Sequence, residues 1–190
     1  MDIWLIRHTS VAIGPSYCYG RSDVALADTF HAEAAAVRAK IGIQGSQDAL
    51  APVITSPAQR CTRLAASLGG QVSEDADLWE MNFGSWEGQK WADLPRAAID
   101  SWANDLGNVA PPGGETLTEV SLRAQRAWGR LIQLGTETVY CVTHAGVIRV
   151  LLAHLFEMPT GRAFSLAVEY GGCTLIQVSD LPPKLKKFNL

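Results

Sequence analysis

The sequence has little charge, no excess of basic residues and no long apolar run. Charged residues make up 18% of the 190 residues, and the formal net charge is −3. Domains that bind nucleic acids usually carry a basic face, so this balance argues against DNA or RNA as a partner. A membrane helix needs roughly 20 consecutive apolar residues, and no run in the sequence approaches that length. We therefore expect neither a nucleic-acid partner nor a membrane partner.

The sequence also lacks a recognisable secretion signal and any paired arrangement of cysteines. Met1 and Asp2 lead directly into a short strand-like run, without a basic region, a long apolar segment and a cleavage site. The four cysteines are scattered and form neither a C-x-x-C pair nor a zinc-finger spacing. These features favour a cytoplasmic protein in which cysteine serves as a small apolar residue.

What the sequence does have is enough apolar character for one core. Hydrophobic residues make up 47% of the chain, which is typical of a globular protein. A length of 190 residues suits one domain better than two, so we expect a single domain over residues 1–190.

Strand and helix signals alternate along the chain. Strands are predicted at 2–7, 52–55 and 138–143, and helices at 29–41, 56–68, 115–134 and 146–156. Ser56 and Pro57 suggest the cap and first turn of the second helix. Residues 77–114 are rich in Trp, Gly and Pro and are expected to be irregular. Residues 165–178, interrupted by two glycines, are predicted to form a hairpin of two strands at a sheet edge.

This alternation predicts an α/β fold with a mostly parallel sheet covered by helices on both faces. In such sheets, ligands bind beyond the carboxyl ends of the strands. Arg7 and His8 end the first predicted strand, and His144 ends the strand at 138–143. The segment 56–60 follows a third strand. We therefore expect these residues to meet at one edge of the sheet.

These residue types suit the transfer of a phosphoryl group. Arg7 and Arg60 offer guanidinium donors for the oxygens of a phosphate dianion. His8 can attack phosphorus through a neutral ring nitrogen if a backbone acceptor holds its other nitrogen. His144 is expected to donate to the phosphoryl oxygens. A protonated carboxyl must complete the reaction at the leaving group, and Glu80 is the candidate.

A metal centre is the alternative for two histidines and an acid. However, the sequence lacks the H-E-x-x-H and H-x-x-E-H spacings of zinc enzymes. A cation would also be repelled by Arg7, directly beside His8. We therefore predict a site without metal or other cofactor.

Four segments, in order, carry a family resemblance. They are LIRHT (5–9), TSPAQR (55–60), LWEMNFGSWEG (78–88) and VTHAGVIR (142–149). Together they resemble the signature blocks of the histidine phosphatase (phosphoglycerate mutase-like) superfamily, and they extend over most of the chain. The resemblance implies a three-layer α/β/α fold and a phosphohistidine on His8. It also implies a phosphate pocket of Arg7, Arg60 and His144, with Glu80 as proton donor.

Within that superfamily the sequence is similar to the α-ribazole phosphatases of cobalamin biosynthesis. The Arg-His-Thr triplet at 7–9, the segment CYGRSDVAL at 18–26 and PGGET at 112–116 carry this similarity. It suggests α-ribazole 5′-phosphate as substrate. Thr9, Arg21 and Ala145 are further residues that we expect to contact the substrate.

Three functions remain open at this point. The first is a phosphomonoesterase that acts on a small phosphorylated metabolite, with narrow or broad specificity. The second is a phosphoglycerate mutase, in which the phosphoryl group returns to the substrate. The third is a binding module for phosphorylated ligands that keeps the fold but has no activity. The sequence gives no oligomeric state.

Overall fold

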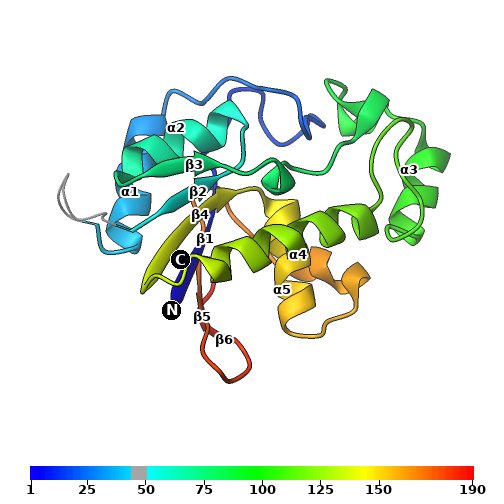
Figure 1. Cartoon of the computed structure of the whole chain (residues 1–190). Coiled ribbons are helices and arrows are strands. Elements are labelled where there is room, and N and C mark those ends of the chain that lie inside the picture. Colours follow the sequence, from blue (N-terminus) through cyan, green and yellow to red (C-terminus); the bar gives the residue numbers. More distant parts are fainter. Residues whose placement is uncertain (44–50) are drawn as a thin grey trace.

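A six-stranded sheet forms the centre of the molecule, with the strand order β3-β2-β4-β1-β5-β6 (Figure 1). The structure is a computed structural model, and it describes residues 1–43 and 51–190. The strands are β1 (Asp2–Arg7), β2 (Val53–Thr55), β3 (Val72–Glu74), β4 (Thr138–Thr143), β5 (Cys173–Gln177) and β6 (Lys184–Lys187). The first four run parallel to their neighbours, whereas β5 and β6 are antiparallel. The sheet is therefore mixed, with its parallel part as predicted.

Helices cover both faces of the sheet, which confirms the three-layer α/β/α prediction (Figure 1). One face carries α1 (Phe30–Lys40) and α2 (Gln59–Leu68), and the other carries α4 (Leu117–Gln133) and α5 (Ala145–Leu155). The short helix α3 (Arg96–Asn104) lies apart from the sheet (Figure 1). Four short 3₁₀ helices complete the regular structure of the described residues: 76–78, 84–86, 91–93 and 160–165. None of the helices described is both long and apolar enough to cross a membrane.

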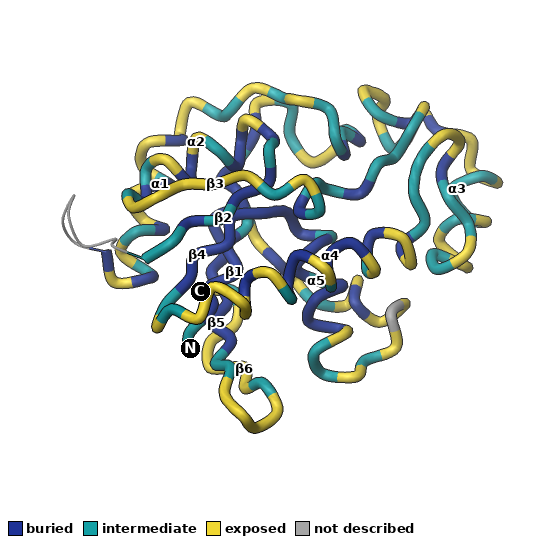
Figure 2. Tube along the Cα trace, in the orientation of Figure 1, coloured by how far each residue is buried: buried dark blue, intermediate teal, exposed yellow. Residues whose placement is uncertain are grey.

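The central strand β1 is covered on both faces, which explains its run of apolar residues. Ile3 and Leu5 point into the core beneath α4 and α5, whereas Trp4 and Ile6 point into the core beneath α1 and α2. Alternate side chains of a strand face opposite sides, so a strand covered on both faces needs apolar residues at every position. The inner strands are accordingly the most buried part of the trace (Figure 2).

The second helix begins later than predicted. It starts at Gln59 with Ala58 at its cap, so Ser56 and Pro57 lie outside it. The Ser56 amide donates to the Val142 carbonyl at 2.9 Å, which continues the pairing of β2 with β4 by one residue. The Ser-Pro pair thus marks the end of a strand. The other predicted end was right, because α2 stops at Leu68 before two glycines.

The predicted hairpin at 165–178 is also wrong. Only Cys173–Gln177 forms a strand, and its hairpin partner is β6 rather than residues 165–172. The Gly171 amide donates to the His8 carbonyl at 3.1 Å, and Gly172 accepts from the Arg7 amide at 3.0 Å. The segment before β5 is therefore held against the end of β1, where it borders the predicted site.

The four cysteines are buried and unpaired, as predicted. Burial raises the pKa of the Cys18 thiol to about 12 and that of Cys173 to about 11. Both thiols thus stay protonated near neutral pH, which is the behaviour of small apolar residues.

Candidate active site

The ends of β1 and β4 bring the two predicted histidines together. The strands are adjacent and parallel, and Arg7 pairs with Thr143 in their register. The next residues, His8 and His144, therefore leave the sheet side by side, with ring centres 5.2 Å apart. This confirms the expected meeting at one sheet edge.

One ring nitrogen of His8 is held by the backbone. The Nδ1 atom lies 2.7 Å from the carbonyl oxygen of Thr9. Because a carbonyl only accepts, Nδ1 carries the proton and the lone pair lies on Nε2. His8 is only 1% exposed, so the ring lies inside the protein. The bond to Thr9 fixes the tautomer that a nucleophilic Nε2 requires.

His144 is held on both sides by protein groups. An Arg60 Nη2 lies 3.2 Å from its Nδ1, and the Ser56 hydroxyl lies 2.8 Å from its Nε2. Since a guanidinium can only donate, Nδ1 accepts and Nε2 donates to Ser56. Donation to a phosphoryl oxygen, as expected from the sequence, thus requires that oxygen to replace the Ser56 hydroxyl.

The surroundings keep both rings neutral. Burial lowers the pKa of His8 well below its ordinary value, and the positive charges of Arg60 and Arg7 lower it further. The pKa of His144 is lowered by burial and by Arg60 in the same way. A neutral imidazole is the form that can act as a nucleophile, so this environment suits attack by His8.

These lowered pKa values predict a loss of stability in weak acid. The unfolded chain binds protons on both histidines below pH about 6.5, whereas the folded chain does not, so unfolding becomes easier as the pH falls. Each histidine contributes at most roughly 1.4 kcal/mol per pH unit. We expect the melting temperature to fall between pH 7 and pH 5, and His144→Gln to flatten that fall. The exposed His154→Gln is the control, and equal slopes in both variants would contradict the assignment.

Arg60 and Arg7 each carry a buried Nε donor that the protein leaves unused. Arg60 is fully buried and donates to the carbonyls of Ser22 and Gly20, at 2.8 and 2.6 Å. Arg7 donates to the Val168 carbonyl at 2.6 Å. Among the described residues, neither Nε atom has a hydrogen-bond partner. An unsatisfied buried donor costs about 1–3 kcal/mol, so both guanidinium groups are poised for an acceptor such as an anion.

The predicted acid lies against the start of α5. The Oε2 atom of Glu80 accepts from the Gly146 amide at 3.2 Å, and its Oε1 accepts from the Met81 amide at 3.0 Å. A Cβ atom on residue 146 would lie 2.3 Å from Oε1. Gly146 therefore makes room for the carboxyl group beside Ala145.

A cleft of about 400 Å³ opens over these residues. It is lined by Arg7, Pro15, Tyr17, Tyr19, Gly20, Glu80, Phe83, Trp91, Trp102, Ala145, Arg149, Phe164 and Tyr170. The loop at 13–23 and the Trp-rich segment thus both contribute walls to the cleft. Trp102 packs against the core on one side and lines this cleft, where its ring stacks on Trp91 with centres 6.2 Å apart. Trp86 is buried beside it and does not line the cleft.

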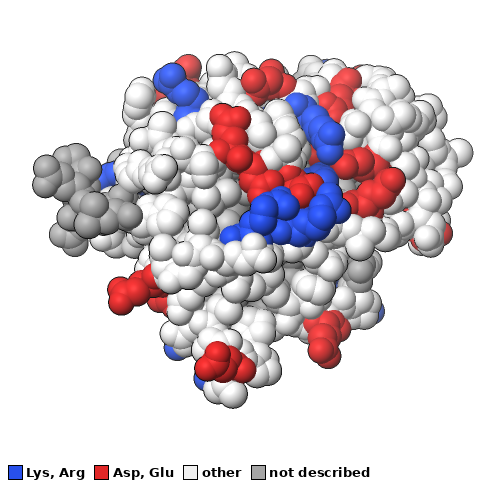
Figure 3. Space-filling view, in the orientation of Figure 1, with Lys and Arg blue, Asp and Glu red and all other residues white. Residues whose placement is uncertain are grey.

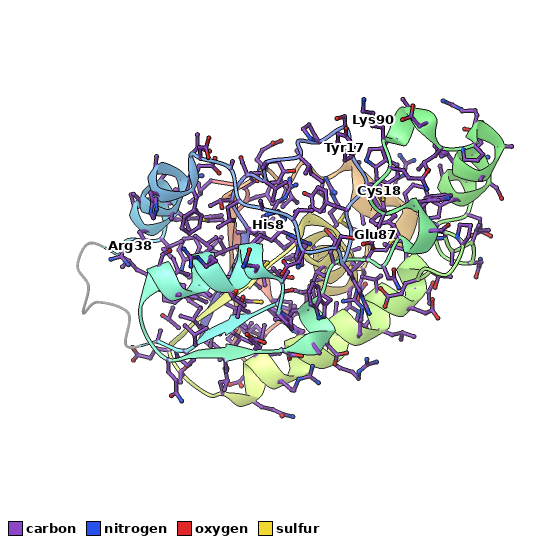
Figure 4. All side chains as sticks on the ribbon, turned by 90° about the horizontal axis from the view of Figure 1, so that it is seen from above. His8, Tyr17, Cys18, Arg38, Glu87 and Lys90 are labelled. Atoms are coloured by element: carbon purple, nitrogen blue, oxygen red, sulfur yellow. The ribbon has the colours of Figure 1, made fainter. Side chains whose placement is uncertain are left out.

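The two wall segments are joined by backbone and side-chain bonds. Figure 4 shows Tyr17 and Cys18 close to Glu87 and Lys90. The Cys18 amide donates to the Gln89 carbonyl at 2.9 Å, and the Lys90 ammonium lies 5.7 Å from the centre of the Tyr17 ring. These contacts fix the loop after β1 against the second wall.

Of the further predicted contacts, Ala145 lines the cleft, whereas Thr9 and Arg21 do not. Thr9 is fully buried, and its hydroxyl has no partner among the described residues. The Arg21 guanidinium is engaged with the Glu115 carboxylate at 2.8 Å. The structure therefore directs Arg21 toward another side chain.

Sequence reasoning missed two tyrosines. Tyr19 and Tyr170 join hydroxyl groups at 2.9 Å, and the Arg7 guanidinium lies 3.7 Å from the centre of the Tyr170 ring. Tyr19 belongs to a segment that the sequence singled out, so it could have been named. Tyr170 follows no strand or motif, and only the folded chain places it beside His8, with ring centres 5.5 Å apart.

Comparison with known families agrees with this geometry. The sequence profile of the histidine phosphatase superfamily (branch 1) matches residues 3–190. The chain belongs to this superfamily.

Relatives within the superfamily include proteins with assigned phosphatase names. The adenosylcobalamin/alpha-ribazole phosphatase of Salmonella typhimurium is 31% identical over 117 residues, which are 60% of this chain and 58% of that protein. The bifunctional protein Rv2228c of Mycobacterium tuberculosis is 28% identical over 183 residues, 91% of this chain and 49% of that protein. The chain thus spans about half the length of these curated relatives.

Solved structures show the same fold. The alpha-ribazole phosphatase from Shigella flexneri superposes with a TM-score of 0.87 at 25% identity, over 100% of this chain and 96% of that one. The three-layer architecture is therefore that of the histidine phosphatases.

Proposed function

We propose that the chain is a metal-independent phosphomonoesterase that works through a phosphohistidine on His8. The observation that carries this proposal is the buried His8, whose Nδ1 is held by the Thr9 carbonyl at 2.7 Å between two arginines with unused donors. A neutral nucleophile beside two fixed cations suits a phosphate dianion.

The roles of the residues follow from this arrangement. The Nε2 atom of His8 forms a bond to phosphorus, and the bond from phosphorus to the leaving oxygen breaks. Arg7 and Arg60 hold the equatorial oxygens, while Glu80 gives its proton to the leaving alcohol. Water then attacks the phosphohistidine, the carboxylate of Glu80 takes a proton from that water, and inorganic phosphate leaves. Each turnover returns His8 and Glu80 to their starting forms.

Turnover of p-nitrophenyl phosphate in the presence of EDTA tests the reaction class. A rapid quench during turnover should trap a phosphoenzyme that is labile in acid and stable in alkali, as expected of a phosphohistidine. Absence of turnover would favour a binding module instead. Interconversion of 2- and 3-phosphoglycerate without release of phosphate would favour a mutase.

For the substrate we propose α-ribazole 5′-phosphate. The relative from Salmonella typhimurium bears the name of that activity, and the cleft has aromatic walls from Phe83, Trp91 and Trp102. A flat base can stack on such a wall at roughly 1–3 kcal/mol, by analogy with bases on aromatic side chains in nucleic-acid complexes. A small polar leaving group such as glycerate gains little from it.

This proposal predicts a preference that can be measured. We expect a higher kcat/KM for α-ribazole 5′-phosphate than for 3-phosphoglycerate or sugar phosphates. Trp91→Ala should raise KM for α-ribazole 5′-phosphate by about 5- to 150-fold, which corresponds to the loss of one stacking contact. The KM for 3-phosphoglycerate should change little. Uniform activity over the panel would indicate a phosphatase of broad specificity.

A further inference from the structure

Glu80 lies on a stretch of chain with little regular structure. The residues around it follow the 3₁₀ turn at 76–78 and form no strand or α-helix. Among the described residues, the Glu80 carboxylate accepts hydrogen bonds only from the Met81 and Gly146 amides. A proton donor must nevertheless be held within hydrogen-bond reach of the leaving oxygen. Something else must therefore fix this segment.

A single buried guanidinium holds the backbone of that segment. Arg123, on α4, is 5% exposed. Its Nη1 donates to the carbonyls of Asp77, at 2.8 Å, and Trp79, and its Nη2 donates to the Glu80 carbonyl at 3.0 Å. Three carbonyls within four residues thus converge on one side chain, and one of them belongs to Glu80 itself.

The remaining donors of Arg123 go to one carboxylate. The Nε and Nη2 atoms each lie 3.1 Å from an oxygen of Glu115. With the three carbonyls, these bonds occupy all five N–H groups of the guanidinium. Glu115 also accepts from the Asn82 amide at 2.9 Å, two residues beyond Glu80. The segment is therefore bound on both sides of Glu80 by one ion pair.

We propose that Arg123 is the positioning residue of the proton donor, and that it acts on the reaction through the Glu80 backbone. This inference rests on the proposed phosphatase function. All five N–H groups of Arg123 are bonded to protein oxygens, so the side chain has no donor left for the phosphoryl group or the leaving group. Its loss should therefore impair the step that needs Glu80 more than the attack by His8. A misplacement of about 1 Å can cost about 10²-fold in rate.

The test compares leaving groups of different basicity. Arg123→Lys keeps the charge but offers only three donors. We expect it to lower kcat for an alkyl phosphate by about 10- to 100-fold. The loss for p-nitrophenyl phosphate, whose leaving group barely needs a proton, should stay within about 3-fold. Arg126→Lys is the matched control, because Arg126 lies on the same helix and is bound to the Asp77 carboxylate at 2.7 Å. It should change neither rate.

A double variant separates positioning from general stability. Adding Arg123→Lys to Glu80→Gln should not lower kcat for the alkyl phosphate any further, because the proton donor is already absent. Additive losses, or equal losses on both substrates, would overturn the proposal. If Arg123→Lys does not fold, Glu115→Gln is the substitute variant. It should also lower kcat more for the alkyl phosphate than for p-nitrophenyl phosphate, by a smaller factor. Equal effects of Glu115→Gln on the two substrates would overturn the proposal too. Failure of the wild-type protein to form a phosphoenzyme would instead reject the proposed function.

Discussion

His8→Ala should abolish turnover of every phosphate monoester while leaving the protein folded. We expect kcat to fall by more than about 10⁴-fold, because removal of the nucleophile from a site that acts as a unit eliminates the covalent route. Among the described residues the side chain makes one hydrogen bond, from Nδ1 to the Thr9 carbonyl, and losing that bond should cost about 0.5–1.5 kcal/mol of stability. The measurements are steady-state rates and thermal unfolding followed by circular dichroism.

A phosphoenzyme trap gives the second readout for this variant. The wild-type protein should show the acid-labile species in a rapid quench, and His8→Ala should show none. His154→Ala, an exposed histidine on α5, is the matched control and should retain both turnover and the trap. Near-normal turnover by His8→Ala would reject covalent catalysis at this residue. A trapped species that persists in it would move the nucleophile elsewhere.

The placement of His8 and His144 could be predicted from the sequence because it depends on strand ends. Each histidine directly follows a continuous apolar run, and such runs form the buried parallel strands of α/β sheets. Adjacent parallel strands end at the same edge, so the two residues had to meet there. The exposure of His8 could not be predicted, since the segments that cover it come from elsewhere in the chain. Tyr19 and Tyr170 lie 11 and 162 positions further along.

The errors arose where a local signal competed with a tertiary contact. Ser56 and Pro57 are typical of a helix start, but the Ser56 amide pairs with β4 and its hydroxyl binds His144. The residues before Gly171 resemble a strand, but the Arg7 side chain binds the Val168 carbonyl, and the Gly171 amide binds the His8 carbonyl. In both places the sequence signal was outweighed by bonds to residues more than 80 positions away, as in the 2.8 Å contact of Ser56 with His144. Both places border the active site.

The exposed arginines of α4 differ from those of the active site, because they form ion pairs at the surface. Arg126 and Arg130 pair with Asp75 and Asp77 at 2.6 to 2.8 Å, and Figure 3 shows basic and acidic side chains gathered on this face. Because these two guanidinium groups are already paired with carboxylates, they are not expected to bind an external anion. Arg123 lies on the same helix but is turned inward. Whether an arginine of α4 reaches the Glu80 segment therefore depends on which face of the helix carries it. The sequence indicates that face only through the helical repeat of its apolar residues.

The contribution of Glu80 should appear as a contrast between leaving groups. Glu80→Gln keeps the size of the side chain and can still accept from the Gly146 amide through its amide oxygen, but it has no proton to give. Hydrolysis of alkyl phosphates should slow by about 10²- to 10⁴-fold, the usual range for general acid catalysis. Hydrolysis of p-nitrophenyl phosphate should slow far less, because p-nitrophenolate leaves without a proton.

Two other acids provide the controls for that assignment. Glu87 accepts from the amides of Arg21 and Ser22 at 2.9 and 2.7 Å, and Asp77 is paired with Arg126 at the surface. Neither lines the cleft, so Glu87→Gln and Asp77→Asn should affect alkyl and aryl phosphates alike. Equal losses on both substrates in Glu80→Gln would assign it a binding role. A leaving-group contrast confined to Glu87→Gln would transfer the role of proton donor to Glu87, because only the residue that protonates the leaving oxygen can produce that contrast.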